Sequence, residues 1–126
     1  MGGQKRQEAL TPTIAVDFDG TLCKEEWPGI GAPNEKLIDF LIRWRQDGNK
    51  VILWTCRENT MLVQAVDWCA EHGLHFDAVN CNLPERVIAY NNDSRKIGAD
   101  YYIDNACTLV VDNKQVITPP RKEIWL

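Results

Sequence analysis

The chain has 126 residues, of which 44% are hydrophobic and 25% are charged, and its formal net charge is -4. This length suits one domain with a single hydrophobic core, and the composition is too apolar for a disordered chain. The negative charge argues against a nucleic-acid partner held by bulk charge alone. The opening stretch MGGQKRQEALTP lacks the apolar core of a signal peptide, and no apolar run is long enough to span a membrane. We therefore expect a cytoplasmic protein with no membrane partner.

The five cysteines are spread along the chain without close pairing: Cys23, Cys56, Cys69, Cys81 and Cys107. An odd number of cysteines without an export signal is typical of reduced thiols. Most of them are expected to be buried packing residues, because free cysteine behaves as a small apolar side chain.

In chain order, residues 1–11 are polar and without periodicity, and we expect them to form a flexible tail before a single domain at 12–126. Thr13–Val16 is short, apolar and β-branched, which is typical of a buried strand. A loop is expected around 29–33, where glycine and proline gather. A helix should follow, with Asn34 as its N-cap and Gly48 as its stop, because apolar residues recur at helical spacing between them.

Further elements alternate in the same way. The remaining expected strands are Lys50–Trp54, His75–Val79, Tyr101–Ile103 and one or two short runs at 109–111 and 115–118. The remaining expected helices run from about Asn59 to Gly73 and, more weakly, over Pro84–Tyr90. Strands that alternate with helices of about a dozen residues indicate right-handed crossovers and a parallel sheet covered on both faces. The predicted fold class is α/β.

Ligands of such sheets bind beyond the carboxyl ends of the strands, so the residues that follow each strand are candidates for a site. These are Asp17–Thr21, Thr55–Arg57 and Asp104–Asn105, with Lys96 and Asp100 shortly before the last of these strands. Carboxylates that converge at one edge repel one another unless a cation joins them, and hard oxygen ligands suit Mg²⁺. A hydroxyl, backbone N–H groups and a lysine or arginine would complete a phosphate-binding site.

Asp17 and Asp19 are two positions apart, so their side chains leave an extended segment on the same side. The carboxylate nearer the cation stays ionised and nucleophilic. The other is held neutral by its like-charged neighbour and serves as a general acid. Gly20 allows the chain to turn sharply away from this position.

The run Asp17-Phe18-Asp19-Gly20-Thr21-Leu22 resembles the first motif of the haloacid dehalogenase (HAD) superfamily, whose members are mostly Mg²⁺-dependent phosphohydrolases. Thr55, Lys96 and Tyr101–Asn105 are similar to its second, third and fourth motifs, in the family's order. The resemblance implies a three-layer α/β sandwich with a mainly parallel, Rossmann-like sheet. The two insertion points, at 22–33 and 80–94, are too short for a cap domain, since even small domains need about 50 residues.

The resemblance also implies roles at the acidic positions. Asp17 would attack phosphorus and form an aspartyl-phosphate, and Asp19 would protonate the leaving group and then activate water. Asp17, the backbone carbonyl of Asp19, and Asp104 would hold Mg²⁺. The fourth motif often carries a second acid where this chain has Asn105. Asp100 is an alternative acid, but it precedes the apolar triplet, so Asp104 is the favoured ligand.

For the phosphoryl group, the resemblance implies contacts from the Thr55 hydroxyl and the Cys56 N–H, and charge neutralisation by Lys96. Arg57 stays open between an exposed position and a contact with substrate, since arginine recognises anions well. A zinc site at Cys69, His72 and His75 is disfavoured because a glycine ends the helix between the histidines.

The function that the resemblance implies is Mg²⁺-dependent hydrolysis of a small-molecule or macromolecular phosphomonoester. Two alternatives remain open: a nucleic-acid-end 3′-phosphatase, which small cap-less members of the superfamily also include, and a non-catalytic module that binds phosphate or a partner. An open cleft could also be closed by homo-oligomerisation.

Overall fold

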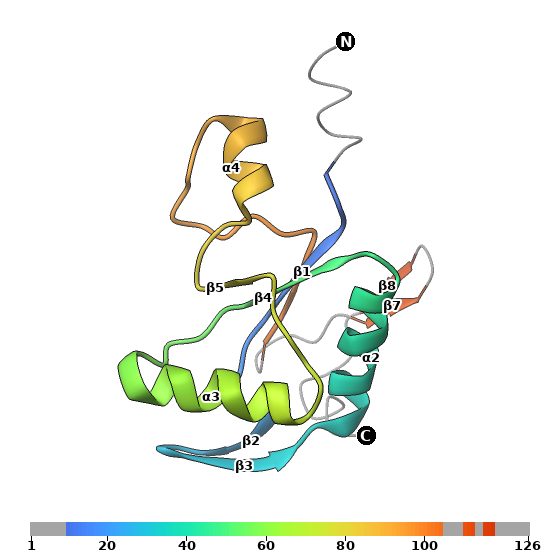
Figure 1. Ribbon diagram of the computed structural model, residues 1–126. Coiled ribbons are helices and arrows are strands. Elements are labelled where there is room, and N and C mark those ends of the chain that lie inside the picture. The colour runs from blue at the N-terminus through green and yellow to red at the C-terminus, as the bar shows by residue number, and fades with distance from the viewer. Residues whose placement is uncertain (1–9, 105–109, 113–114, 118–126) are drawn as a thin grey trace.

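The computed structural model describes residues 10–104, 110–112 and 115–117. Its centre is a four-stranded parallel sheet in the order β5-β4-β1-β6 (Figure 1). The strands are β1 (Thr13–Val16), β4 (Lys50–Leu53), β5 (Ala78–Val79) and β6 (Tyr101–Ile103). All four residues of β1 are buried, because β1 has a strand on either side and covered faces above and below.

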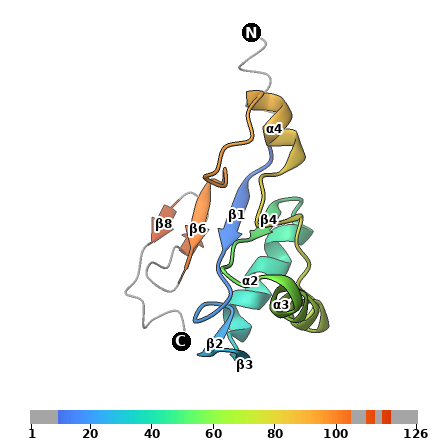
Figure 2. The ribbon, with the colours of Figure 1, turned by 90° about the vertical axis from the view of Figure 1, so that its left-hand side faces the viewer.

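Helices and loops cover the two faces of the sheet. The helices are α2 (Glu35–Gln46), α3 (Asn59–Glu71) and α4 (Pro84–Tyr90). Ile14 and Val16 pack into the larger core on the face of α2 and α3, which lie side by side in Figure 2. Ala15 points the other way and packs with Leu83 in the smaller core. The alternation along one strand therefore separates two cores, and the predicted α/β class with a mainly parallel, Rossmann-like sheet is confirmed.

The predicted helices and most predicted strands are present with nearly the expected bounds. Asn34 is the N-cap of α2, and its side chain accepts a hydrogen bond from Leu37 N at 3.4 Å. Two short strands, β7 (Val110–Asp112) and β8 (Gln115–Ile117), form a separate antiparallel pair. Within the part of the chain that the structure describes, no helix is both long and apolar enough to cross a membrane.

The prediction of a loop around 29–33 is wrong. The chain forms an antiparallel hairpin there, of β2 (Cys23–Glu26) and β3 (Gly29–Pro33), which lies at the opposite end of the molecule from α4 (Figure 1). Gly31 lies so close to β2 that a Cβ atom built on it would be 2.4 Å from the Lys24 carbonyl oxygen. The glycine that suggested a loop is therefore the residue that lets the two strands approach.

The strand expected at His75–Val79 is shorter than predicted and covers only Ala78–Val79. Asp77 explains the late start, because its carboxylate accepts a hydrogen bond from Val51 N at 2.8 Å and occupies the place of a ladder partner. Of the four described cysteines, Cys23 and Cys69 are buried, whereas Cys56 and Cys81 are exposed, so only half fit the expected packing role. Cys107 and Asn105 lie outside the described residues.

Candidate active site at the carboxyl edge of the sheet

Asp17 and Asp104 emerge side by side from adjacent parallel strands. Val16 is paired with Ile103, and Asp17 N donates to the Ile103 carbonyl at 2.9 Å, so the ladder continues past both strand ends. Neighbouring strands are about 4.8 Å apart, which places the two acids at one position of the sheet edge. The predicted juxtaposition of the first and last acids therefore follows from the strand register.

The carboxyl group of Asp17 is in an environment that disfavours its charge. Burial raises its pKa to about 6, against a hydrogen bond from Phe18 N–H, and the charges of Asp104 and Asp19 add to the rise. The Thr21 hydroxyl, 3.5 Å from Asp17 Oδ2, is a weak donor to the same group. A cation bound at this position would relieve the repulsion and favour the ionised form of Asp17.

The segment after Asp17 turns back on itself. Gly20 has a φ of 77°, a left-handed conformation that glycine adopts without strain, and the Phe18 carbonyl accepts hydrogen bonds from Thr21 N and Leu22 N. Thr21 is fully buried, and its carbonyl accepts a hydrogen bond from Asn34 Nδ2 at 3.0 Å. Sequence reasoning did not assign a role to Thr21 or to this contact, although Thr21 follows the acidic pair directly.

Arg57 is the most informative side chain of the site. It is only 1% exposed, so the exposed position considered from the sequence is wrong. Its Nε donates to Asp19 Oδ2 at 2.8 Å and its Nη2 to Asp19 Oδ1 at 2.7 Å, a two-point ion pair. Its guanidinium lies between two aromatic rings, with Cζ 5.1 Å from the centre of Phe18 and 4.9 Å from that of Trp27. Arginine suits such a position because its planar cation stacks and bonds at once.

The remaining nitrogen contacts of Arg57 go to the turn of the hairpin. Nη1 donates to the Pro28 carbonyl at 3.3 Å, and Nη2 also donates to the Gly29 carbonyl at 2.8 Å. Every side-chain nitrogen of Arg57 therefore has a protein acceptor. This geometry assigns Arg57 to holding Asp19 and the hairpin together, and it does not favour the predicted contact between Arg57 and a phosphoryl group.

Thr55 and Cys56 lie at the same edge, after β4. Trp54 N donates to the Val16 carbonyl at 2.8 Å, which keeps the end of β4 beside that of β1. Thr55 N donates to Asn80 Oδ1 at 2.8 Å, and the Thr55 hydroxyl accepts from Arg57 N at 3.1 Å. The turn is thus held by side chains on both sides. Asn80, which the sequence placed only in a polar loop, has a φ of 54° and positions Thr55.

Lys96 is exposed, and its Nζ lies 5.6 Å from the ring centre of Tyr102. Tyr102 belongs to β6, which ends one residue before Asp104. Lys96 therefore lies beside the strand that leads to Asp104. Among the ion pairs of the described residues, none joins Lys96 to Asp17.

Asp100 lies at the opposite edge of the sheet. Its Oδ2 accepts hydrogen bonds from Thr13 N at 2.7 Å and from Arg86 Nη2 at 2.9 Å, at the amino end of β1. This position excludes Asp100 from the carboxyl edge and leaves Asp104 as the acid beside Asp17.

The oxygen donors at the carboxyl edge are few. Within the described residues, no group of three or more histidine, cysteine or acidic side chains is gathered to hold a metal ion. The Asp19 carboxylate forms an ion pair with Arg57 and is not the neutral neighbour of Asp17 expected from the sequence. The carboxyl groups considered as Mg²⁺ ligands are those of Asp17 and Asp104. Two hard carboxylates and a backbone carbonyl fit Mg²⁺, which keeps several waters and takes few protein ligands.

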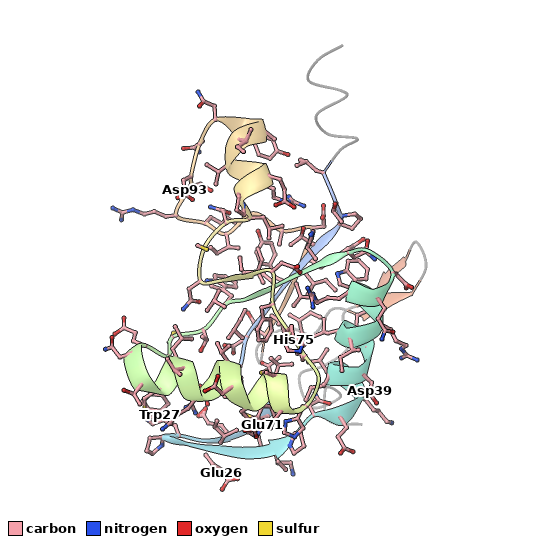
Figure 3. The ribbon with its side chains drawn as sticks, viewed as in Figure 1. Glu26, Trp27, Asp39, Glu71, His75 and Asp93 are labelled. Atoms are coloured by element: carbon pink, nitrogen blue, oxygen red, sulfur yellow. The ribbon has the colours of Figure 1, made fainter. Side chains whose placement is uncertain are left out.

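A hollow of about 310 Å³ opens beside Asp19, lined also by Glu25, Trp27, Cys56 and Arg57. Figure 3 shows Trp27 at the turn of the β2–β3 hairpin, below α3. The hollow thus combines the candidate general acid with an aromatic side chain.

No model of a known protein family matches the chain, and no curated protein sequence matches it. Among solved structures, it is similar to a conserved protein from Bacteroides thetaiotaomicron at 35% sequence identity and a TM-score of 0.68. The similarity covers 92% of this chain and 88% of the other. The description of that protein names no activity.

Proposed function

This chain belongs to the same family as the conserved Bacteroides thetaiotaomicron protein, and we propose that it is a Mg²⁺-dependent phosphomonoester hydrolase that acts through an aspartyl-phosphate on Asp17. The observation that carries the proposal is the position of Asp17. It ends the central strand beside Asp104, with Asp19 close enough for its charge to act on the same carboxyl group. The resemblance of this segment to the first HAD motif supports the same assignment.

In the proposed first step, an Asp17 carboxylate oxygen attacks phosphorus, and the bond between phosphorus and the ester oxygen breaks. For this step the Asp19 carboxyl group takes up a proton and gives up one of its two hydrogen bonds from Arg57. It then gives this proton to the departing oxygen, so that a neutral alcohol leaves. In the second step, Asp19 takes a proton from water, and the resulting hydroxide displaces Asp17 from phosphorus. Inorganic phosphate leaves, and both aspartates return to their starting states.

The other residues support these steps. Thr55 and the Cys56 N–H lie at the same edge and are proposed to bind the phosphoryl oxygens, with Lys96 neutralising developing charge. When bound, Mg²⁺ would be held by Asp17, the Asp19 carbonyl and Asp104, and it would supply charge stabilisation to the phosphoryl group. Arg57 positions the carboxyl group of Asp19 through hydrogen bonds to it.

The test is phosphate release from a panel of phosphomonoesters with Mg²⁺, with and without EDTA. Asp17→Asn removes the nucleophile and is expected to lower kcat at least about 1000-fold, as is typical when a covalent catalyst is lost. Asp19→Asn is expected to lower it about 100-fold or more, since general acid–base catalysis contributes that much. The control is Asp39→Asn, an exposed acid on α2, which should act like the wild type (Figure 3).

Thermal unfolding of each variant separates loss of chemistry from loss of fold. Turnover by Asp17→Asn equal to that of the wild type would reject the nucleophile. Absence of turnover by the wild type, together with Mg²⁺-dependent phosphate binding unaffected by Asp17→Asn, would favour the non-catalytic module.

A further inference from the structure

A hollow opens beside Asp19, the proposed general acid. Resting on the function proposed above, Asp19 gives a proton to the departing oxygen, and proton transfer needs hydrogen-bond contact between donor and acceptor. The alcohol part of the substrate must therefore lie against Asp19. The space of about 310 Å³ that opens there is lined by Glu25, Trp27, Cys56 and Arg57.

Trp27 provides a large aromatic surface in this space. Its side chain is 57% exposed at the turn of the hairpin, although its ring stacks on the Arg57 guanidinium. Arg57 in turn is fixed by Asp19, by Phe18 and by the Gly29 carbonyl. The indole is thus braced by a buried cation, while much of its surface stays open to solvent. Such a pre-positioned ring loses little freedom when a ligand stacks on it.

The charge of the hollow favours one class of leaving group. Of the five residues that line it, two are acids, Asp19 and Glu25, and the cation is Arg57, whose nitrogens all have protein acceptors. A leaving group with further phosphates would meet Glu25 without a free cation to compensate. An uncharged aromatic group would meet the open surface of Trp27.

We propose that this hollow is the leaving-group subsite and that Trp27 is its stacking platform, so that the substrates are phosphomonoesters whose alcohol carries an uncharged aromatic ring. The bond that breaks joins phosphorus to the oxygen of this alcohol. The phosphoryl group passes to Asp17, and the departing oxygen takes its proton from Asp19. Trp27 acts on specificity and takes no part in the proton transfer.

The experiment compares benzyl phosphate with cyclohexylmethyl phosphate. Both are primary alkyl esters of similar size, so the ring differs in aromaticity rather than in the position of the ester bond. For the wild type we expect kcat/KM to be about 3- to 10-fold higher for the benzyl ester, the range that an aromatic contact contributes beyond area burial. Trp27→Leu should abolish this preference, and Trp27→Phe should keep most of it.

Tyr90→Leu is the matched control. Tyr90 is 56% exposed, like Trp27, but it belongs to α4 at the other end of the molecule. This variant should keep the wild-type preference. Thermal unfolding shows whether Trp27→Leu is folded, and the ratio of its kcat/KM values for the two esters reports the preference whatever its absolute activity.

Equal kcat/KM of the wild type for the two esters, or an equal loss on both in Trp27→Leu, would overturn the subsite while leaving the hydrolase intact. The subsite would also be overturned if kcat/KM were higher for a 3′-phosphorylated oligonucleotide than for benzyl phosphate and fell as the salt concentration rose. If the wild type released phosphate from none of these compounds in Mg²⁺, the proposed function itself would fail, and the subsite with it.

Discussion

At the scale of single residues, Arg57 shows how burial separates two roles that a sequence leaves together. From the sequence alone, an arginine that follows Thr55 could bind phosphate or form an ion pair within the protein. The structure surrounds it with the carboxylate of Asp19 and two carbonyl groups of the hairpin turn, so its charge is used within the protein. We therefore interpret Arg57 as a positioning residue for the general acid.

This interpretation predicts the kinetic effect of Arg57→Lys. Lysine keeps the charge but cannot form the two-point pair, so Asp19 loses its fixed orientation. We expect kcat for an alkyl phosphomonoester to fall about 10- to 100-fold, because small misplacements of a catalytic group cost about that much. 4-Nitrophenyl phosphate should lose much less, since its leaving group departs without a proton.

Steady-state kinetics on both substrates checks this prediction, with Arg43→Lys on the exposed part of α2 as the control. A rise in KM with unchanged kcat, equal for both substrates, would instead assign Arg57 to phosphate binding. The two outcomes differ in the parameter that changes, so a merely structural effect of the variant is recognisable.

Much of the site was predictable at this scale. Asp17, Asp19 and Asp104 could be placed at one edge because parallel strands bring their carboxyl ends together, whatever the details of packing. The partner of Arg57 could not, since it depends on a hairpin turn about thirty residues earlier in the chain. The position of Lys96 likewise depends on the conformation of a loop, which the spacing of apolar residues does not predict.

At the scale of elements, the strands and helices with a buried stripe were predicted nearly to the residue. The β2–β3 hairpin was missed because three of the four residues of β2, Lys24 to Glu26, are exposed. A strand that buries almost nothing has no alternation of apolar and polar side chains to read. Its signal lay instead in the glycines of β3, which were interpreted as loop residues.

The close approach in the hairpin predicts the effect of Gly31→Ala. The new Cβ would lie 2.4 Å from the Lys24 carbonyl oxygen, a backbone atom that cannot move without displacing β2. We expect a loss of about 1–3 kcal/mol in the free energy of unfolding, the usual cost of overpacking. Urea unfolding measures it.

Gly98→Ala is the control for this substitution, because the nearest atom to the new Cβ is a side-chain oxygen of Asn82 at 3.4 Å. The free energy of unfolding should fall less in this variant than in Gly31→Ala. Equal stability of Gly31→Ala and the wild type would mean that the hairpin is looser than its geometry indicates. Since the hairpin turn holds Arg57, the variant is also expected to lose activity on alkyl esters.

At the scale of the whole molecule, the acids at the two edges of the sheet differ in their surroundings. At the amino edge, Asp77 pairs with Arg45 at 3.0 Å and Asp100 with Arg86 at 2.9 Å, and each also accepts a strand N–H. At the carboxyl edge, burial raises the pKa of Asp17, and the charges of Asp104 and Asp19 add to the rise. The acids of the amino edge are each paired with an arginine, whereas Asp17 at the carboxyl edge is a partly buried acid close to two others, which is the arrangement expected of a functional site.

The amino edge leads to a pH-dependent prediction for Asp77→Asn. Burial opposes the charge of Asp77, but the hydrogen bonds from Arg45 and Val51 N and the charges of Arg45 and Lys50 outweigh it and lower the pKa. A carboxyl group with a lowered pKa stabilises the fold above its unfolded value of about 3.9, and this contribution is lost as the pH falls through the folded value. We expect Asp77→Asn to unfold about 1–2 kcal/mol more easily than the wild type at pH 7.

Urea unfolding at pH 7, 5 and 3 checks this, and the difference between variant and wild type should persist at pH 5 and shrink at pH 3. Asp39→Asn, an exposed acid on α2, should show no comparable dependence. A difference that is the same at all three values would mean that Asp77 acts through its hydrogen bonds alone and not through its charge. In that case the acids of the amino edge would stabilise the fold through hydrogen bonding and packing rather than through their charge.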